Sequence, residues 1–338
     1  LMDMEMVQYH PTTLKGSGVL ISEAARGEGA FLLNSENERF MLKYAPEFKE
    51  LASRDVVSRC AQTEINEGRG IDGCVLLDLR HLGEKYISER LSQIRELAMD
   101  FANVDMVKDP VPIMPGMHYQ MGGIKADING ETAVKGLYAA GEVACLSVHG
   151  GNRLGANSLL DTLVFGRRSG VHASETAKNI NFMELDDSSS QPDRRKIQRL
   201  LDNDKNESFG PIRFDMGTAM KEHFGVFREE ASMNQGLNKL NGFRDRFEEV
   251  YVEDKTKTFN TNLLFTLELD FMIECAETIA ISSMERKESR GAHTRTDMPE
   301  RDDENWLKHT LVSLGEDKPS MDYLPVTITR WKPERRVY

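Results

Sequence analysis

Hydrophobic residues recur along this chain with the spacing of strands in some segments and of helices in others. Apolar runs predict strands at 74–79, 124–128, 132–140 and 323–329. Between the middle two runs, Asn129-Gly130 predicts a tight hairpin turn. Longer periodic patterns predict helices at 53–66, 85–101, 193–204, 215–229, 233–251, 261–287 and 301–312. Together these strands and helices predict an α+β fold.

The helix expected at 85–101 shows the periodicity most clearly. We expect one face of it to pack on a core, through Ile87, Leu91, Ile94, Ala98 and Phe101. Prolines at 110, 112 and 115 then predict a stiff connector, and the acidic, serine-rich stretch 183–193 predicts a linker.

A glycine-rich loop at 147–156 follows an expected short strand at 136–142. It leads into an expected helix that begins near Asn157 or Ser158, both favourable N-cap residues. Free N–H groups at a helix N-terminus attract an anion or an electron-rich ring, and Arg153 adds a positive charge. Taken alone, such a loop is a tight turn as often as a binding site.

Composition narrows the class of protein. A length of 338 residues predicts two or three domains, and a net charge of −12 argues against a nucleic-acid partner. The four cysteines are scattered, which predicts reduced, buried thiols with neither a metal site nor a disulfide. Acidic residues interrupt the longest apolar stretch, 263–281, so we expect a core helix there and no direct insertion into a membrane.

Three positions in the first sixty residues carry local chemistry. His10 precedes a proline, which favours extended backbone at the histidine. Residues 22–26 read as the first turn of a short helix, in which Glu23 and Arg26 share a face and can form an ion pair. Arg54 stands at a helix start, where a positive charge is unfavourable, and this suggests a use other than helix stability.

Six blocks of sequence, taken in order, resemble the flavoprotein subunit of succinate dehydrogenase and fumarate reductase. They lie at 3–12, 22–29, 53–57, 118–123, 140–161 and 285–306. The family begins with a dinucleotide-binding βαβ unit whose Gly-x-Gly-x-x-Gly turn holds the flavin pyrophosphate, and our interpretation is that no such motif occurs within these residues. The resemblance therefore identifies the chain as the C-terminal portion of a longer flavoprotein.

The resemblance implies an organisation in four parts. These are a capping (lid) domain at 1–115, the C-terminal segment of an FAD-binding α/β domain at 116–182, a helical domain at 183–312 and a tail at 313–338. It also implies that the cofactor is FAD, bound in the complete protein.

For the substrate, the resemblance implies a four-carbon dicarboxylate, succinate or fumarate. The groups that bind it correspond to His10, Ser22, His118 and Arg153. Ser22 stands where the family commonly has Thr, so the hydroxyl donor is kept without the β-branch that fixes its rotamer.

The resemblance assigns proton transfer to Arg54, Glu23 and Arg26. A guanidinium is normally always charged, so the proton is expected to pass through Arg54 toward Glu23 without Arg54 resting neutral. Flavin contacts are assigned to the carboxylate of Glu142 and to the backbone of Ser158 and Leu159.

The implied reaction is oxidation of succinate to fumarate by hydride transfer to FAD, with electrons passed to an iron–sulfur subunit. Membrane anchor subunits would hold the assembly, placing this chain in the cytoplasm on the inner face of the cell membrane. Two alternatives stay open. One is a fumarate reductase or an L-aspartate oxidase-like flavoenzyme. The other is a non-catalytic fragment that binds no flavin on its own.

Overall fold

The computed structural model describes residues 1–182, 184, 186–204, 207–315 and 319–334. The chain divides into two compact units. The first comprises Leu1–Met6 and Gln120–Val326, and the second comprises Val7–Tyr119 and the residues from Thr327 on.

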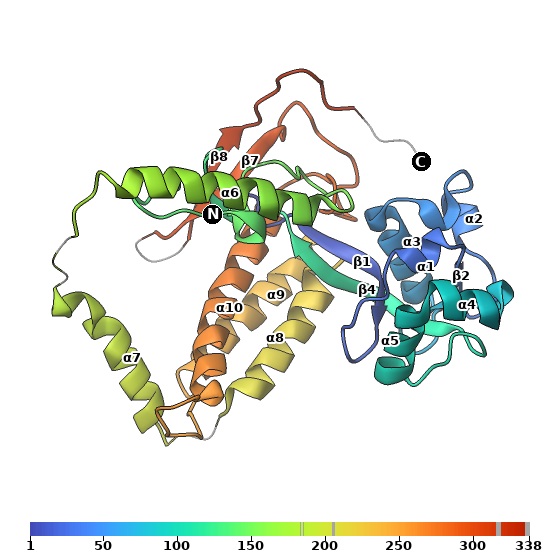
Figure 1. Cartoon of the computed structure of the whole chain (residues 1–338), viewed down its shortest axis with the longest axis horizontal. Coiled ribbons are helices and arrows are strands. Elements are labelled where there is room, and N and C mark those ends of the chain that lie inside the picture. Colours follow the sequence, from blue (N-terminus) through green and yellow to red (C-terminus); the bar gives the residue numbers. More distant parts are fainter. Residues whose placement is uncertain (183, 185, 205–206, 316–318, 335–338) are drawn as a thin grey trace. The chain divides into compact units, whose positions relative to one another are not determined.

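The second unit contains a four-stranded sheet with the order β1-β4-β3-β2 (Figure 1). Its strands are β1 (Val7–Leu14), β2 (Phe31–Leu33), β3 (Val75–Asp78) and β4 (Val111–Gln120). The helices are α1 (Ala24–Gly27), α2 (Met41–Tyr44), α3 (Arg54–Asn66), α4 (Glu84–Arg90) and α5 (Ser92–Ala102). The unit also contains two 3-10 turns, η1 (Lys49–Leu51) and η2 (Arg80–Leu82).

All eight residues of β1 are buried, and several of them are polar. Helices α3 and α5 contact this strand, and apolar side chains from strands and helices form one core around Leu32, Val57, Leu77 and Ile113. Polar side chains in a strand buried on both faces need partners inside the protein, because unpaired burial is costly. The buried polar side chains of β1 are therefore candidate site residues.

The first unit is mainly helical between residues 157 and 285, and two strands follow (Figure 1). Its helices are α6 (Asn157–Ala177), α7 (Gln191–Asp202), α8 (Phe209–His223), α9 (Glu230–Phe247) and α10 (Thr261–Glu285). The strands are β5 (Ile124–Lys125) and β6 (Ala144–Cys145), which pair in parallel, and β7 (Lys308–Ser313) and β8 (Ser320–Pro325), which pair antiparallel. The 3-10 turns are η3 (Gly141–Val143) and η4 (Asp187–Ser190).

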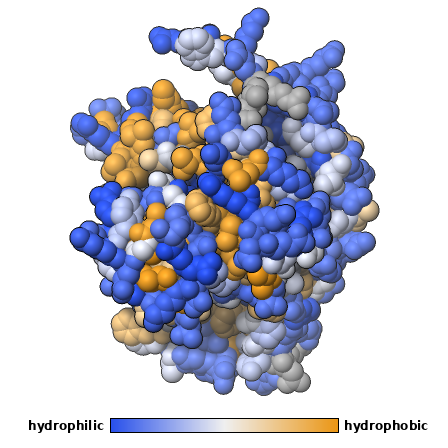
Figure 2. All heavy atoms as spheres, turned by 90° about the vertical axis from the view of Figure 1, so that its right-hand side faces the viewer, coloured by the Kyte–Doolittle hydropathy of each residue, from blue (hydrophilic) through white to orange (hydrophobic). Residues whose placement is uncertain are grey.

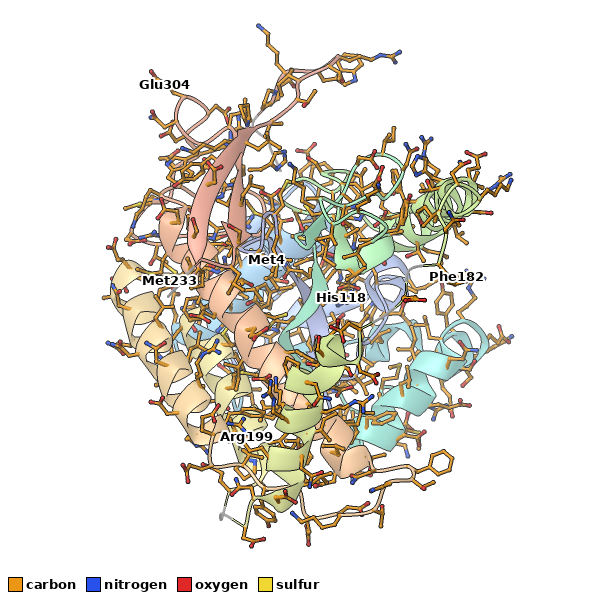
Figure 3. The ribbon with its side chains drawn as sticks, turned by 90° about the vertical axis from the view of Figure 1, so that its left-hand side faces the viewer. Met4, His118, Phe182, Arg199, Met233 and Glu304 are labelled. Carbon is orange, nitrogen blue, oxygen red and sulfur yellow. The ribbon has the colours of Figure 1, made fainter. Side chains whose placement is uncertain are left out.

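Helices α8, α9 and α10 share a core that includes Met233 of α9, labelled in Figure 3. Lys196 of α7 pairs with Asp270 of α10, and Leu200 adds an apolar contact to the same core. The expected mixed fold with a helical region toward the C-terminal end is therefore confirmed. Figure 2 shows one face of the molecule, where hydrophobic patches lie among hydrophilic side chains.

Several local predictions are wrong. The helix expected at 85–101 is two helices, α4 and α5, because Leu91 leaves helical geometry with φ −129° and ψ 24°. Phe101 is 49% exposed and does not belong to the buried face. The proline-rich connector is the strand β4, in which Pro112 lies opposite Leu76 of β3.

The helix expected at 301–312 is also wrong. There the side chain of Asp302 accepts the backbone N–H groups of Glu304 and Asn305, which forms a turn, and the strand β7 follows. The turn at Asn129-Gly130 is present, with Gly130 at φ 76°. However, 132–140 forms only isolated bridges, and the strand expected at 136–142 ends in the 3-10 turn η3.

All four cysteines are described, and none forms a disulfide. Burial raises the pKa of Cys145 to about 12, which keeps this thiol protonated. Cys275 is exposed, so the prediction that every thiol is buried is wrong at that position. Within the described ranges, no helix is both long and apolar enough to cross a membrane, and no cluster of three possible metal ligands is present.

Candidate active site

His10 lies in the middle of β1 and is fully buried. Thr12 holds the ring through two contacts to Nδ1, from its backbone N–H at 3.3 Å and its Oγ1 at 3.0 Å. The same Oγ1 donates its one hydrogen to the carbonyl of Ile21 at 2.6 Å, so the roles of the two Nδ1 contacts depend on the tautomer of His10. In the tautomer protonated at Nε2, the ring offers a donor to a carboxylate.

Arg54, the first residue of α3, forms an ion pair with Glu23, which precedes α1. Its Nη2 and Nε lie 2.7 Å and 3.1 Å from the same oxygen, Oε2 of Glu23. The other oxygen, Oε1, accepts a hydrogen bond of 2.8 Å from Nη2 of Arg26. Glu23 therefore bridges two guanidinium groups, so the pairing expected between Glu23 and Arg26 is present and extends to Arg54.

Burial differs along this chain of charges. The side chain of Arg26 is 1% exposed, that of Arg54 is 14% exposed and that of Glu23 is 44% exposed. Arg26 also donates through Nη1 to the backbone carbonyls of Glu50 and Ala52. Desolvation lowers the pKa of Arg26 despite its carboxylate partner. The pKa of Glu23 is lowered, because hydrogen bonds and charge from Arg54 and Arg26 outweigh the effect of partial burial.

His118 extends this chain of contacts toward β1. It lies near the end of β4, where Figure 3 labels it, and its Nε2 is 3.4 Å from Nη1 of Arg54. A guanidinium can only donate, so Nε2 of His118 accepts. The rings of His118 and His10 stand edge to face with their centroids 5.1 Å apart. We call His118, Arg54, Glu23 and Arg26 the relay, and all four belong to the second unit.

Ser22 stands directly before the relay carboxylate. Its Oγ accepts the backbone N–H of Ala24 at 3.3 Å, and its side chain is exposed. The neighbouring Ile21 exchanges hydrogen bonds with Thr12, both through backbone groups and through Oγ1 of Thr12. These bonds tie the segment that carries Ser22 to the strand that carries His10.

Arg153 belongs to the first unit, in the glycine-rich loop before α6. Its side chain is buried, and Nη1 donates to the carbonyl of Leu154 at 3.3 Å. In the same loop, His149 Nε2 lies 3.1 Å from Oδ2 of Asp161 of α6, which fastens the loop to the helix.

The block at 285–306 also contacts this loop, and we did not predict this contact from the sequence. Ala292 donates its backbone N–H to the carbonyl of Gly151 at 2.8 Å. Gly291 has φ 60°, and a Cβ there would lie 2.3 Å from the oxygen of Gly151. Only glycine allows this close approach, so the Gly291-Ala292 dipeptide was the available sequence signal.

The groups expected to contact flavin fit such a ligand. Glu142 accepts the backbone N–H of Gln120 at 3.0 Å while its side chain stays exposed. Helix α6 begins after Ala156, which is in left-handed geometry with φ 65° and supplies no side-chain cap. The helix start near Asn157 is confirmed, but neither Asn157 nor Ser158 is the N-cap. An N-terminus without a side-chain cap suits a ring with acceptor oxygens, and Ser158 and Leu159 lie in its first turn.

The interpretation that no Gly-x-Gly-x-x-Gly motif occurs is wrong as to spacing, because residues 68–73, Gly-Arg-Gly-Ile-Asp-Gly, match it. They connect helix α3 to strand β3, whereas the turn of a βαβ unit leads from a strand into a helix. This segment is therefore not the phosphate-binding turn of the family.

The structure also brings together Asp3, His309 and Ser147, which we did not predict. Nδ1 of His309 lies 2.6 Å from Oδ2 of Asp3, and its Nε2 lies 3.3 Å from Oγ of Ser147. Strand β7 thereby holds both the start of the chain and the start of the glycine-rich loop.

Two family models match the chain. The one described as an FAD binding domain matches residues 1–159, and the one described as the C-terminal part of the fumarate reductase flavoprotein matches residues 213–338. Together with the mixed fold, they define the class of this protein as flavin-dependent oxidoreductases.

Relatives narrow the class. The fumarate reductase flavoprotein subunit of Haemophilus influenzae is 43% identical over 359 residues, which cover 100% of this chain and 60% of the relative. The succinate dehydrogenase flavoprotein subunit of Coxiella burnetii is 46% identical over 91% of this chain and 55% of the relative. The FrdA chain of E. coli quinol fumarate reductase matches with a TM-score of 0.94 and 42% identity, over 100% of this chain and 61% of that chain.

The chain belongs to the flavoprotein subunit family of succinate dehydrogenase and fumarate reductase, as the resemblance indicated. It spans about three fifths of the length of these relatives. Membership of an FAD-binding family indicates FAD in the full protein.

Proposed function

We propose that the complete flavoprotein oxidises succinate to fumarate, and that this chain supplies the groups that bind the dicarboxylate and remove a proton from it. The relay supports this proposal most strongly. It is a continuous series of contacts from an imidazole through Arg54 and Glu23 to the buried Arg26.

Succinate brings two negative charges that must leave water. Burying a charge without a partner costs several kcal/mol, so each carboxylate needs donors. We assign His10, His118 and Ser22 to this task in the second unit, and Arg153 in the first. Charge-assisted hydrogen bonds contribute roughly 1.5–3 kcal/mol each, and a guanidinium can donate two in parallel.

Oxidation removes one hydride and one proton from adjacent carbons. FAD, when bound, supplies the two-electron acceptor for the hydride. The proton enters the relay at Arg54 as the carbon–carbon double bond forms. Because Arg54 already donates two hydrogen bonds to Oε2 of Glu23, a proton can pass to this carboxylate without a resting neutral guanidine. Among Arg54, Glu23 and Arg26, the side chain of Glu23 is the most exposed, which suits release of the proton to water.

The opposite direction, reduction of fumarate, uses the same groups in reverse, and an L-aspartate oxidase-like reaction shares most of them. Curated relatives carry both the succinate dehydrogenase and the fumarate reductase names. The amino-acid sequences of residues 157–161 and of the block 285–306 resemble succinate dehydrogenase and favour succinate oxidation.

The proposal also includes the assembly. The relatives are named as subunits, and the similar E. coli structure is that of a quinol fumarate reductase. We propose an iron–sulfur subunit as electron acceptor and membrane anchor subunits. These would keep this chain in the cytoplasm, peripheral on the inner face of the cell membrane.

Arg153→Lys in the complete flavoprotein tests the binding assignment. Lysine keeps the charge but cannot donate in a bidentate manner, so we expect succinate affinity to fall by about 10- to 100-fold. The matched control is Arg194→Lys, an exposed arginine of α7, which should leave affinity and turnover unchanged. Unchanged succinate affinity in Arg153→Lys would remove Arg153 from the site.

A further inference from the structure

Arg26, the last member of the relay, also contacts the 3-10 turn η1. Its Nη2 donates to Glu23, while its Nη1 donates to the backbone carbonyls of Glu50 and Ala52. One guanidinium therefore joins the relay carboxylate to η1. Because a guanidinium is planar and rigid, the position of η1 determines where Arg26 can hold Glu23.

Glu50 of η1 has a buried carboxylate, and its side chain is only 3% exposed. Arg39 binds both of its oxygens, with Nε 2.7 Å from Oε1 and Nη2 2.6 Å from Oε2. The backbone N–H of Leu32 also donates to Oε1, at 3.3 Å. Two parallel charge-assisted hydrogen bonds and a backbone donor together fix the direction of this carboxylate.

Arg39 is in turn held by aromatic rings. Its guanidinium carbon lies 4.0 Å from the centroid of the Phe31 ring. That ring stacks on the ring of His81, with centroids 4.0 Å apart and 4° between the planes. A cation over an aromatic face is stabilised by the ring. Glu50 and Arg39 are therefore a fixed charge pair, although the side chain of Arg39 is partly exposed.

Charges of opposite sign alternate from the relay into this pair. Arg54 and Arg26 share the single carboxylate of Glu23, and Glu50 supplies a second negative charge near the buried Arg26. Desolvation lowers the pKa of Arg26, and the charges of Glu23 and Glu50 oppose this effect, whereas the charge of Arg54 adds to it. The line of charged and titratable groups runs through His10, His118, Arg54, Glu23, Arg26, Glu50 and Arg39.

We propose that Glu50 is a positioning residue of the relay. Its backbone carbonyl places Arg26, and its carboxylate, fixed by Arg39, adds a negative charge that favours transfer of a proton to Glu23. No bond at Glu50 forms or breaks, because Glu50 acts through Arg26. The inference rests on the proposed proton transfer through the relay.

The pH dependence of kcat for succinate oxidation by the complete flavoprotein tests this inference. Glu50→Gln keeps the backbone carbonyl and the size of the side chain but removes the charge. More positive surroundings lower the pKa of Glu23, so the acidic limb of the profile should move to lower pH by about half a unit or more. Because Glu23 becomes a weaker proton acceptor, kcat at pH 7 should fall by about 3- to 30-fold. KM for succinate should change by less than about twofold, because Glu50 does not contact the substrate.

Two control variants separate this effect from a loss of stability. Glu64→Gln removes another buried carboxylate of the same unit, 1% exposed and bound through both oxygens by Arg69, and it should leave the pH profile in place. Glu50→Asp keeps the charge and should restore the profile of the unsubstituted protein.

Arg39→Gln gives an independent measurement, which also serves if Glu50→Gln does not fold. It removes a positive charge from the same line, so the profile should move to higher pH. An active flavoprotein whose profile is the same in the Glu50 and Arg39 variants as in Glu64→Gln would contradict this inference alone. A complete, unsubstituted flavoprotein that does not oxidise succinate would overturn the proposed function and this inference with it.

Discussion

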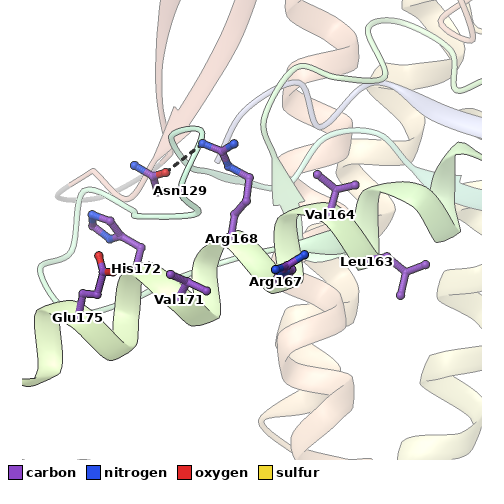
Figure 4. A pocket seen from close by; sticks show the side chains of 8 residues that line it. All are labelled: Asn129, Leu163, Val164, Arg167, Arg168, Val171, His172 and Glu175. Carbon is purple, nitrogen blue, oxygen red and sulfur yellow. Dashed lines mark hydrogen bonds between the residues drawn. The ribbon is translucent and has the colours of Figure 1, made fainter.

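The relay of the second unit and the apolar face of α6 in the first unit differ in whether their side chains have partners within their own unit. The α6 apolar face consists of Leu159, Leu160, Leu163, Val164 and Val171, three of which Figure 4 labels. Each charged group of the relay already has a partner of opposite sign or a hydrogen-bond acceptor within its own unit. The α6 face instead exposes five large apolar side chains. The relay thus pairs its charges within one unit, whereas the apolar side chains of α6 stay exposed in the other.

The difference follows from the cost of each kind of group. A buried charge without a partner costs several kcal/mol, so a buried guanidinium such as Arg26 must be paired when the unit folds. An exposed apolar side chain forgoes only about 25 cal/mol for each Å² that it fails to bury. A helix can therefore retain an apolar face until a partner arrives.

Arg54→Lys breaks the relay and should have the largest effect. Lysine cannot contact Glu23 and His118 through separate nitrogens, and we expect turnover of the complete flavoprotein to fall by about 10²- to 10⁴-fold, as for loss of a proton-transfer group. The measurement is steady-state succinate oxidation. Arg59→Lys, one turn further along α3 and paired with Asp55 at 2.9 Å, is the control and should retain activity. Similar rates for both variants would exclude Arg54 from proton transfer.

Glu64→Gln tests whether the ionic contacts of the second unit stabilise it. A hydrogen bond from Arg69, assisted by Tyr44 and Asn34, lowers the pKa of Glu64 to about 2 against the opposing effect of burial. Between this value and the ordinary value of 4.5 the unfolded chain binds a proton that the folded chain does not, so stability falls as pH falls through this window. The contribution is about 3 kcal/mol.

The stability advantage of the unsubstituted chain over Glu64→Gln should therefore shrink as pH decreases from 5 toward 2. Urea unfolding at several pH values measures it. Glu36→Gln, at an exposed carboxylate of the same unit, should show no such trend. A constant difference between the unsubstituted chain and Glu64→Gln across this range would contradict the assignment.

Gly291→Ala tests the close packing between Gly291 and the glycine-rich loop that carries Arg153, in the first unit. The new Cβ would meet the oxygen of Gly151 at 2.3 Å in a backbone with positive φ. We expect a loss of about 1–3 kcal/mol in the free energy of unfolding. Thermal unfolding measures the loss. Gly242→Ala, in α9 with no atom within 4 Å of its added Cβ, should be neutral or slightly stabilising. Equal stability of the two variants would show that the contact is not tight.

Ser22→Ala should have the smallest effect. It removes one hydroxyl donor at an exposed position, which changes substrate binding by roughly 0.5–1.5 kcal/mol, or about 2- to 10-fold in affinity. Ser22→Thr, which keeps the hydroxyl and adds a β-branch, is the control and should bind succinate at least as well as the unsubstituted protein. Equal affinity in all three forms would remove Ser22 from the substrate contacts.

Sequence patterns predicted those parts of the fold in which local signals and packing agree. Helix α3 ends at Asn66, where the helix expected at 53–66 ends, and α10 follows its long apolar periodicity. The helix expected at 301–312 failed because the side chain of Asp302 forms a turn and β7 pairs with a strand that is separate in sequence. Strand β4 was missed because tertiary pairing accommodates prolines that locally suggest a connector.

For the candidate site, spacing alone predicted only the pair of Glu23 and Arg26. The link from Glu23 to Arg54 joins residues 31 positions apart, and that from Arg54 to His118 joins residues 64 positions apart. Neither distance can be read from a periodic pattern, and the resemblance to a family supplied both candidates. Whether the loop at 147–156 was a turn or a site was likewise undecided by its residues. Its anchoring by Gly291 and Asp161 appears only in the folded chain.

The flavin absorbance of the isolated 338-residue chain tests the central claim most directly. The chain is equilibrated with excess FAD and passed through a gel-filtration column, and the visible spectrum of the protein peak is recorded. Because the described residues contain no strand-to-helix turn of the Gly-x-Gly-x-x-Gly type, we expect a colourless peak without stoichiometric flavin. A yellow peak with one FAD per chain would contradict it.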